Sequence, residues 1–221
     1  MLVARAALQP DDLAALRRRA VDAATHLFAA QGYDAVTMRA VAAALGVSAM
    51  TPYRWLSGKE ELFALVRAEA FRRFADHLEA SLAGLADPVE RLLRLKQAYV
   101  GFALDEPDAY RIMFELRQPD PDGGDAAAEL GAQSRRAFGH LHDSVAAAVA
   151  AGYLDGDPLT LAHLMWASTH GLVSLHLAGK LVGRSVQQLA AIDHELGGLR
   201  RLPRRRRVAR RAAKKPTRST S

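Results

Sequence analysis

The sequence contains no cysteine, and this absence excludes several kinds of chemistry. Disulfide bonds, thiolate metal ligands and thiol redox sensing all need a residue that the chain lacks. The absence fits a reducing cytoplasm, where we expect the protein to work. Aromatic residues make up only 6% of the 221 residues, and β-branched residues are sparse beside alanine, leucine and arginine. This composition favours helices over strands.

Long uninterrupted apolar runs are also missing from the chain. No stretch approaches the ~20 apolar residues that are needed to span a bilayer. No N-terminal segment joins a basic flank to an apolar run, as a secretory signal would. We therefore expect a soluble, intracellular protein with no membrane partner. Half of the residues are nevertheless hydrophobic, so the chain can bury a core.

Residues 199–221 contain no acidic residue, so the net charge of +6 is spread unevenly along the chain. Residues 1–80 carry a net +1, residues 81–198 a net −6 and residues 199–221 a net +11. The acidic middle is a poor surface for binding DNA. Residues 199–221 are predicted to be a basic disordered tail. Two interpretations of the tail stay open, a non-specific DNA arm and a solubilising end.

Apolar residues recur at spacings of three and four along most of the chain, and no strand-like alternation occurs. The pattern predicts an all-α fold, with helices at 11–31, 37–44, 48–55, a long stretch from about 59, then 125–151, 159–181 and 185–196. Ser57 with Glu60, and Ser185 with Gln188, have the spacing of capping boxes. Three further helix starts are predicted where an acid precedes proline, at Asp87-Pro88, Glu106-Pro107 and Asp157-Pro158.

Two of the short predicted helices are joined by Leu45-Gly46-Val47, which makes them a candidate helix-turn-helix. Gly46 permits the positive φ that a tight turn between crossing helices needs. Val41, Leu45 and Val47 are expected to bury the contact between the two helices. The second helix could then present its N-terminal side chains to a DNA major groove, which admits one helix.

Residues 18–74 resemble the DNA-binding domain of the TetR family of transcriptional repressors. The matching pieces occur in order and at the family's spacing; they include Gly32-Tyr33, Val36-Thr37-Met38-Arg39, Leu45-Gly46-Val47-Ser48, Thr51-Pro52-Tyr53-Arg54-Trp55 and Ser57-Gly58-Lys59-Glu60-Glu61-Leu62. The resemblance implies that Ala49, Met50, Thr51 and Arg54 face the groove. It also implies phosphate contacts for Ser48, Tyr53 and Lys59.

The start of the first of these two helices, at Thr37, Met38 and Arg39, would offer backbone N–H groups and a helix dipole to a phosphate. The sequence departs from the family pattern at Met50, Pro52 and Leu56, where glycine, a large aliphatic and an aromatic residue are frequent. Ala49 and Met50 have little polar chemistry for reading bases. We therefore expect contacts to thymine methyl groups, with Arg54 as the main polar reader.

A second resemblance involves Tyr110-Arg111-Ile112-Met113-Phe114 and the stretch from Trp166 through His170-Gly171. Both resemble the family's C-terminal domain type that is named for a Trp-His-Gly motif, which implies a helical ligand-binding or dimerisation domain. The candidate ligand-binding residues are Tyr99, Phe102, Tyr110, Met113, Phe114, Phe138, Trp166 and His170. Aromatic residues at helical spacing are also typical of a core, and His170 could be a hydrogen-bonded structural residue. The helices at 125–151 and 159–181 are the candidates for dimerisation.

No pattern indicates catalysis or a metal site. His163 and His170 share a helix face, but no further ligand is seen to converge on them. The sequence therefore predicts a non-enzymatic protein with no cofactor, organised as a DNA-binding domain at 10–60, a regulatory and dimerisation domain at 61–198 and the tail at 199–221. Its predicted role is a homodimeric repressor that a small apolar ligand releases from a palindromic operator on double-stranded DNA. The alternative is an architectural DNA-binding protein that uses its tail.

Overall fold

The computed structural model describes residues 10–116 and 123–190, and all the regular elements among these residues are helices, with no strand. The elements are α1 (Pro10–Gln31), α2 (Met38–Leu45), the 3-10 helix η1 (Pro52–Arg54), α3 (Lys59–Ser81), α4 (Pro88–Asp105), α5 (Pro107–Phe114), α6 (Gly124–Ala150) and α7 (Pro158–Leu177). Residues 186–190 are helical as well. The predicted all-α class is confirmed. The tail at 199–221 and the end of the predicted last helix lie outside the described residues.

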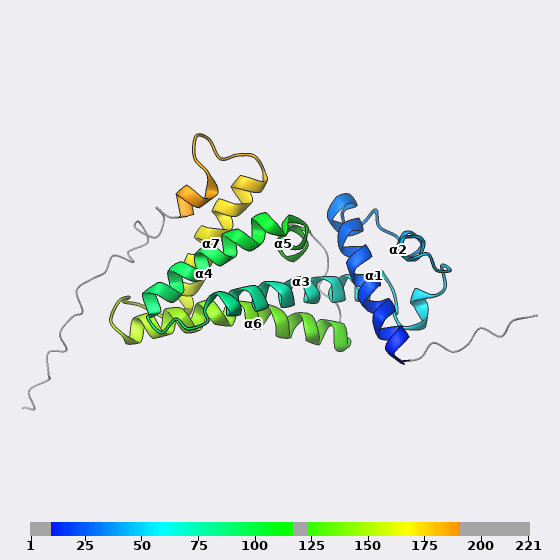
Figure 1. Ribbon diagram of the computed structural model, residues 1–221, viewed down its shortest axis with the longest axis horizontal. Helices are drawn as coiled ribbons and strands as arrows, with labels where there is room; N and C mark the ends of the chain where they lie inside the picture. The colour runs from blue at the N-terminus through cyan, green and yellow to red at the C-terminus, as the bar shows by residue number, and fades with distance from the viewer. Residues whose placement is uncertain (1–9, 117–122, 191–221) are drawn as a thin grey trace, which may run out of the picture.

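Figure 1 shows an elongated molecule in which one long helix belongs to both halves. α1, α2, η1 and the start of α3 form a group that we call the head. α3 then runs on beside α6, with which it makes the most extensive helix contact, and α4 and α7 pack on this pair. α5 lies next to α1 and so closes the junction between the head and the bundle.

The head has a core of its own, which is built around aromatic rings. Phe28 of α1 is fully buried, and its ring meets that of Phe63 of α3 edge to face, with centroids 4.6 Å apart. Tyr33 stacks on Phe28 at 5.9 Å and contacts Phe63 at 5.2 Å. Edge-to-face ring pairs add stabilisation beyond the area that they bury. This cluster fixes the start of α3 against α1.

The three predicted helix starts, in which an acidic residue precedes proline, differ in whether the acidic side chain caps the helix. Asp87 accepts hydrogen bonds from the backbone N–H groups of Val89 and Glu90, and Asp157 accepts one from that of Thr160, as predicted for N-caps. The predicted helix start at Glu106-Pro107 is confirmed, since α5 begins at Pro107 with Glu106 as its N-cap residue, but the side-chain cap expected of Glu106 is missing. Its side chain makes no capping hydrogen bond, and its carboxylate instead pairs with Arg73 of α3 at 3.1 Å.

In the first of the two predicted capping boxes, the residue that pairs with Ser57 is not the predicted Glu60. α3 begins at Lys59 as predicted, but its N-cap is Gly58, whereas the box requires Ser57 in that position. Glu61, and not Glu60, therefore accepts hydrogen bonds from the backbone N–H and the hydroxyl of Ser57, at 2.7 and 2.8 Å. The second box is confirmed, because Ser185 and Gln188 exchange hydrogen bonds of 3.0 and 3.2 Å.

The predicted helix over 48–55 is wrong, because only the three residues of η1 are helical there. Pro52 lacks the N–H that would bond to the carbonyl of Ser48 in an α-helix. The N–H of Thr51 bonds to Ser48 instead, and that of Trp55 bonds to Pro52, so these bonds join residues three apart. The helix predicted at 159–181 also ends early, at Leu177, where Gly179 adopts a φ of 65°.

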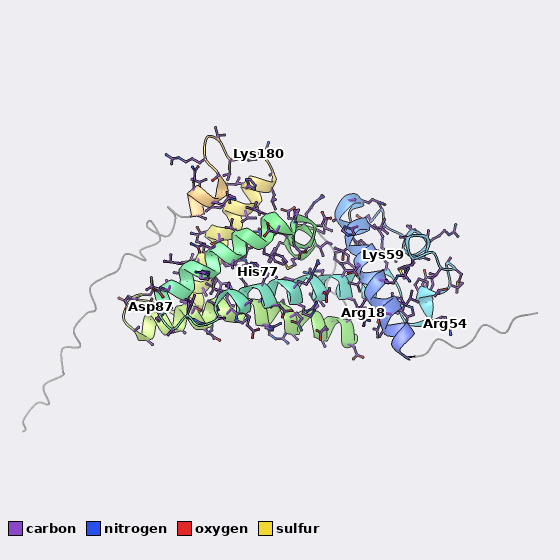
Figure 2. All side chains as sticks on the ribbon, in the orientation of Figure 1. Arg18, Arg54, Lys59, His77, Asp87 and Lys180 are labelled. Carbon is purple, nitrogen blue, oxygen red and sulfur yellow. The ribbon has the colours of Figure 1, made fainter. Side chains whose placement is uncertain are left out.

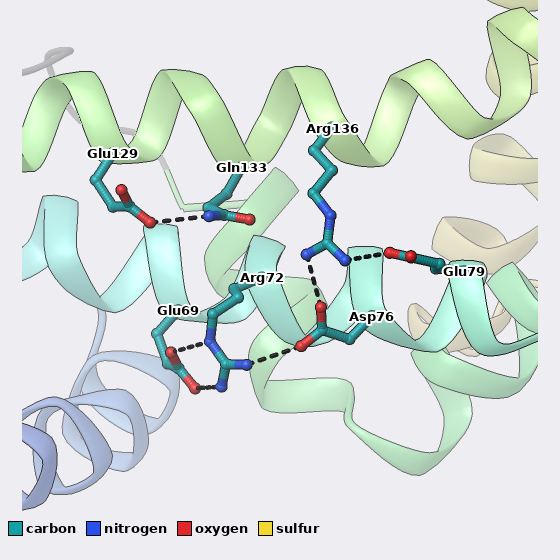
Figure 3. Close-up of polar contacts among 7 residues, drawn as sticks. All are labelled: Glu69, Arg72, Asp76, Glu79, Glu129, Gln133 and Arg136. Carbon is teal, nitrogen blue, oxygen red and sulfur yellow. Dashed lines mark hydrogen bonds and ion pairs between the residues drawn. The ribbon is translucent and has the colours of Figure 1, made fainter.

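Charged side chains cover the outer side of the contact between α3 and α6 (Figure 3). Arg72 pairs with Glu69 at 2.6 Å and with Asp76 at 2.8 Å. Arg136 of α6 reaches across to Asp76 at 2.6 Å and to Glu79. These pairs are partly exposed, so each stabilises the fold only slightly. None of the described helices has the length and apolarity to cross a membrane.

Candidate DNA-binding surface and ligand cavity

The turn after α2 has the conformation that its sequence requires. Gly46 caps the helix in the left-handed region, with a φ of 68° and a ψ of 30°, and the N–H of Val47 bonds to the carbonyl of Ala42 at 3.0 Å. Val41 and Leu45 are buried beneath the turn, and Val47 packs beside them. The predicted positive φ of Gly46 and the burial of Val41 and Leu45 are confirmed, and the chain leaves the turn with its next segment facing outward.

That segment exposes most of the residues that were predicted to read DNA. Met50 is 70% exposed and Tyr53 48% exposed, which is unusual for large apolar side chains. Also exposed are Ser48, Ala49 and Arg54. Thr51 is half-buried, and its hydroxyl lies 2.8 Å from that of Ser48. Arg54, near the end of this exposed segment, lies on the head (Figure 2).

The start of α2 contributes backbone groups more than side chains. Thr37 is the N-cap, and its hydroxyl accepts a hydrogen bond from the N–H of Ala40 at 3.2 Å. Arg39 is exposed. Met38 is only 6% exposed and belongs to the core, so a phosphate could reach its backbone N–H but not its side chain.

Lys59 ties the start of α3 to the segment between α1 and α2. Its ammonium donates hydrogen bonds to the carbonyl oxygens of Tyr33 at 3.1 Å and Asp34 at 3.4 Å. It also lies 4.3 Å from the centre of the Tyr33 ring, within the range of a cation–π contact. These partners lie about 25 residues away in sequence, so no local pattern indicates them.

Two arginines of α1 also support the head, and sequence reasoning missed both. Arg19 donates to the carbonyl of Leu45 at 3.3 Å, where it satisfies one of the free carbonyls at the end of α2. The guanidinium of Arg17 lies 5.8 Å from the ring of Trp55. Trp55 is half-buried, and its indole nitrogen is covered. It therefore supports the exposed segment from beneath.

The bundle encloses a cavity of about 590 Å³ between α3, α4, α6 and α7, with Phe114 of α5 in its wall. Ligand pockets in proteins are typically ~300–1,000 Å³ and mostly apolar. Four of the predicted ligand-binding residues line the cavity: Tyr99, Phe114, Phe138 and Trp166. Phe71, Phe74 and Leu78 of α3 form another part of its wall. The helix that starts in the head is therefore also a wall of the cavity.

The other four predicted residues lie behind the wall. Phe102 packs on Phe74, with ring centroids 5.0 Å apart, and Tyr110 and Met113 are buried. His170 faces a buried polar cluster instead of the cavity. These residues fit the alternative that was left open for them, a structural place in the core.

The polar cluster consists of two tyrosines, a histidine and a tryptophan. The hydroxyls of Tyr110 and Tyr99 lie 2.7 and 3.1 Å from Nδ1 of His170. Trp166 donates its indole N–H to the Tyr99 oxygen at 3.4 Å. Burial lowers the pKa of His170 and raises the pKa of both tyrosines. The cluster is therefore uncharged at neutral pH.

α5 connects the cavity to the head. Phe114, at its end, lines the cavity and lies 6.0 Å from Trp166, measured between ring centroids. One turn earlier, Arg111 donates a hydrogen bond of 2.7 Å to the carbonyl of Ala29 near the end of α1. Across the part of the chain that the structure describes, no three His, Asp or Glu side chains are grouped to hold a metal ion.

The geometry defines a class of protein, a helix-turn-helix head on a helical domain that holds a cavity. Two family models match the chain in the same order. The model for bacterial regulatory proteins of the tetR family matches residues 20–66, and the model for the tetracyclin repressor-like C-terminal domain matches residues 92–198. The chain belongs to the TetR family. Its narrower resemblance to the Trp-His-Gly type stays a prediction, as does the domain boundary at residue 60.

Known proteins resemble this chain in sequence or in fold. The chain is 30% identical over 105 residues to the HTH-type transcriptional regulator HbdR of Aromatoleum sp. (strain CIB), a match that spans 46% of each chain. A protein of unknown function from Rhodococcus sp. RHA1 has a similar structure, with a TM-score of 0.71 and 24% identity over 83% of this chain and 93% of that one. A TetR family protein from Vibrio parahaemolyticus has a TM-score of 0.67 and 23% identity, covering 82% and 96%.

Proposed function

We propose that this protein is a homodimeric repressor, and that a small apolar ligand in the cavity releases it from a palindromic operator. The observation that carries the proposal is the position of α3. This helix begins in the head, where Phe63 packs on Phe28, and two to four turns later Phe71, Phe74 and Leu78 line the cavity. A ligand that displaces this wall would also act on the head.

The exposed segment from Ser48 to Arg54 is the surface proposed to read the operator. Met50 is suited to contact thymine methyl groups, and Arg54 can donate two hydrogen bonds to a guanine edge. The hydroxyls of Ser48 and Tyr53, with the first N–H groups of α2, are positioned for phosphates. Lys59 can add a phosphate contact while it holds the Tyr33 carbonyl, because an ammonium has three N–H donors.

The dimer is proposed to form through the outer face of α7. Leu164 is 63% and Leu175 47% exposed, and between them lie the exposed Ala167 and the half-buried Gly171. These four residues are spaced three or four apart, so they form a single apolar stripe along one helix face. Ala167 and Gly171 have small side chains, so the surface of the stripe is flat between the two leucines. Two copies joined by this stripe could place their heads on half-sites about 34–36 Å apart.

DNA titrations test the proposed reading surface. We expect the protein to prefer a duplex from its own upstream region over a random duplex by about 10³-fold at ~150 mM salt, the lower range for specific binders. Arg54→Ala should weaken binding to the upstream duplex by about tenfold or more. Arg94→Ala, an exposed arginine on α4, is the matched control and should change little. Equal binding to both duplexes would contradict the proposal.

Sedimentation tests the dimer. Leu175→Glu places a charge on the stripe without touching the cavity wall, and we expect it to yield monomers with weakened operator binding. Val182→Glu is the control, because Val182 is 93% exposed on the segment after α7. If the Leu175 variant sediments like the unmodified protein, the stripe is not the interface.

A further inference from the structure

Aromatic side chains are concentrated around the cavity of the bundle. They make up only 6% of the whole chain, yet six of them line this one space. Each helix that surrounds the cavity contributes at least one ring. The six residues are Phe71 and Phe74 of α3, Tyr99 of α4, Phe114 of α5, Phe138 of α6 and Trp166 of α7. An occupant would therefore meet a ring from every helix around it.

Four of these rings stand in two orientations. Phe114 and Tyr99 are close to parallel, with an angle of 24° between their planes. Phe71 and Phe74 are nearly perpendicular to Phe114, at 86° and 89°. A flat ligand that lies parallel to Phe114 would therefore stand at a steep angle to Phe71 and Phe74. It would stack on the first pair of rings and meet the second pair edge to face, and these are the two arrangements that aromatic rings prefer.

The polar side chains of the wall already interact within the protein. The hydroxyls of Ser134 and Thr169 donate to backbone carbonyls of their own helices, at 3.2 and 3.1 Å. The indole N–H of Trp166 donates to the oxygen of Tyr99. The remaining polar residues of the wall, which also interact within the protein, are Lys96 and Ser168. No Asp or Glu lines the cavity. The rings are therefore the main feature by which this wall distinguishes one apolar ligand from another.

The cavity has room for more than one ring. Its volume is about 590 Å³, whereas a cavity of about 150 Å³ is enough to hold one benzene molecule. Phe74 in its wall is buried, but Leu164 of α7, which also lines it, is 63% exposed. A ligand could thus bury its rings beside Phe74 and keep a small polar substituent near water.

We propose that the cavity takes an uncharged aromatic ligand whose flat, fused system has more than one ring. This inference rests on the proposed function, because it names the chemical class of the small apolar ligand for the same cavity. Burial alone would not select such a ligand, since a saturated molecule with the same carbon skeleton has at least as much apolar surface. Contacts between rings add to the free energy of burial, and only an aromatic ligand makes them.

Three alcohols test the inference, each titrated calorimetrically into the full-length protein: 2-naphthalenemethanol, decahydro-2-naphthalenemethanol and decanol. The first two share a carbon skeleton and a hydroxyl group and differ in aromaticity, and decanol is an open chain of similar size. We expect 2-naphthalenemethanol to bind about tenfold more tightly than its saturated counterpart or decanol. Burial of apolar surface alone predicts no such preference.

Substitutions in the wall test whether the rings cause this preference. Phe114→Leu removes one ring but keeps an apolar side chain, so the preference should fall to about twofold or less while the saturated alcohol keeps its affinity. Phe138→Leu tests a second ring of the wall in the same way. Tyr153→Leu is the matched control, because Tyr153 is half-buried like Phe114 and Phe138 but does not line the cavity. It should leave the full preference in place.

The outcomes separate this inference from the proposed function. If the saturated alcohol binds as tightly as the aromatic one, or if both ring variants keep the full preference, the selection of aromatic ligands by the wall is wrong, although the cavity remains a ligand site. If none of the three alcohols binds, the apolar ligand of the proposed function is contradicted as well. If 2-naphthalenemethanol binds with the expected preference but leaves operator affinity unchanged, the inference holds and release by ligand fails.

Discussion

The head and the bundle place their candidate sites in opposite ways. The residues proposed to contact DNA all lie between Thr37 and Lys59, and most of them are exposed. The residues around the cavity come from five helices, between Phe71 and Thr169 in sequence, and most are partly or fully buried. A surface can be built from one short segment, whereas a cavity needs walls from several elements. A DNA-binding surface can therefore be predicted from the sequence, whereas a cavity can be identified only once the fold is known.

The largest effect should come from the core that fixes the head. Phe28→Ala removes a fully buried ring that contacts Phe63 and Tyr33, and we expect the free energy of unfolding to fall by about 3–5 kcal/mol. Leu159→Ala, at a side chain that is 49% exposed, should cost less than about 1 kcal/mol. Urea unfolding measures both. Similar losses for the two variants would contradict the assigned core.

Loss of the Tyr110 hydroxyl in the bundle should lower the free energy of unfolding by a smaller amount. Tyr110→Phe leaves Nδ1 of His170 without its 2.7 Å partner, which should cost about 1–3 kcal/mol of stability. Tyr153→Phe, whose hydroxyl is outside the cluster, serves as the control. A fall in stability confined to the Tyr110 variant would support a structural role for the cluster. No fall in either would mean that Tyr99 replaces the lost bond.

The sequence predicted the features that depend on neighbouring residues, but not those that depend on the packing of distant elements. The turn at Gly46 and the caps at Asp87 and Asp157 depend on neighbouring residues, and each is confirmed. The side chain of Glu106 does not cap α5 as expected, because its carboxylate pairs with Arg73 on another helix. The position of Lys96 among the residues that line the cavity was not predicted, since a single lysine on a helix resembles an ordinary solvated charge. Only the packing of α3, α6 and α7 around α4 places it in a cavity wall.

The pH dependence of stability should distinguish the half-buried His170 from exposed histidines. Burial holds the pKa of His170 below its usual value of 6.5, so the unfolded chain binds a proton more readily. The stability that neutral His170 contributes is present above pH 6.5 and is lost as the pH falls from there through the lowered pKa. Unfolding free energies at successive pH values should decline more steeply in the unmodified protein than in His170→Gln. His163→Gln, at an exposed histidine, should keep the steeper decline.

The smallest effect should come from the charged surface between α3 and α6. Arg136→Met removes two partly exposed ion pairs, with Asp76 and Glu79, and should cost no more than about 1 kcal/mol. The difference from the unmodified protein should shrink at high salt. Arg135→Met, an exposed arginine on the same helix, is the control. A loss that salt does not reduce would show that Arg136 acts through packing.

The central claim is that occupancy of the cavity controls the affinity of the head for DNA. The most direct test is a substitution whose side chain fills the cavity. Ala137 is buried in the cavity wall on α6, so Ala137→Phe should occupy the space without any ligand. Calorimetric titration with decanol, a neutral apolar probe, would verify this by a loss of binding. We expect the affinity of this variant for the upstream duplex to fall by about fivefold or more, the usual range of allosteric coupling, while Ala128→Phe on the exposed side of α6 leaves it unchanged. A folded Ala137→Phe variant that no longer binds decanol yet binds the duplex normally would contradict the account.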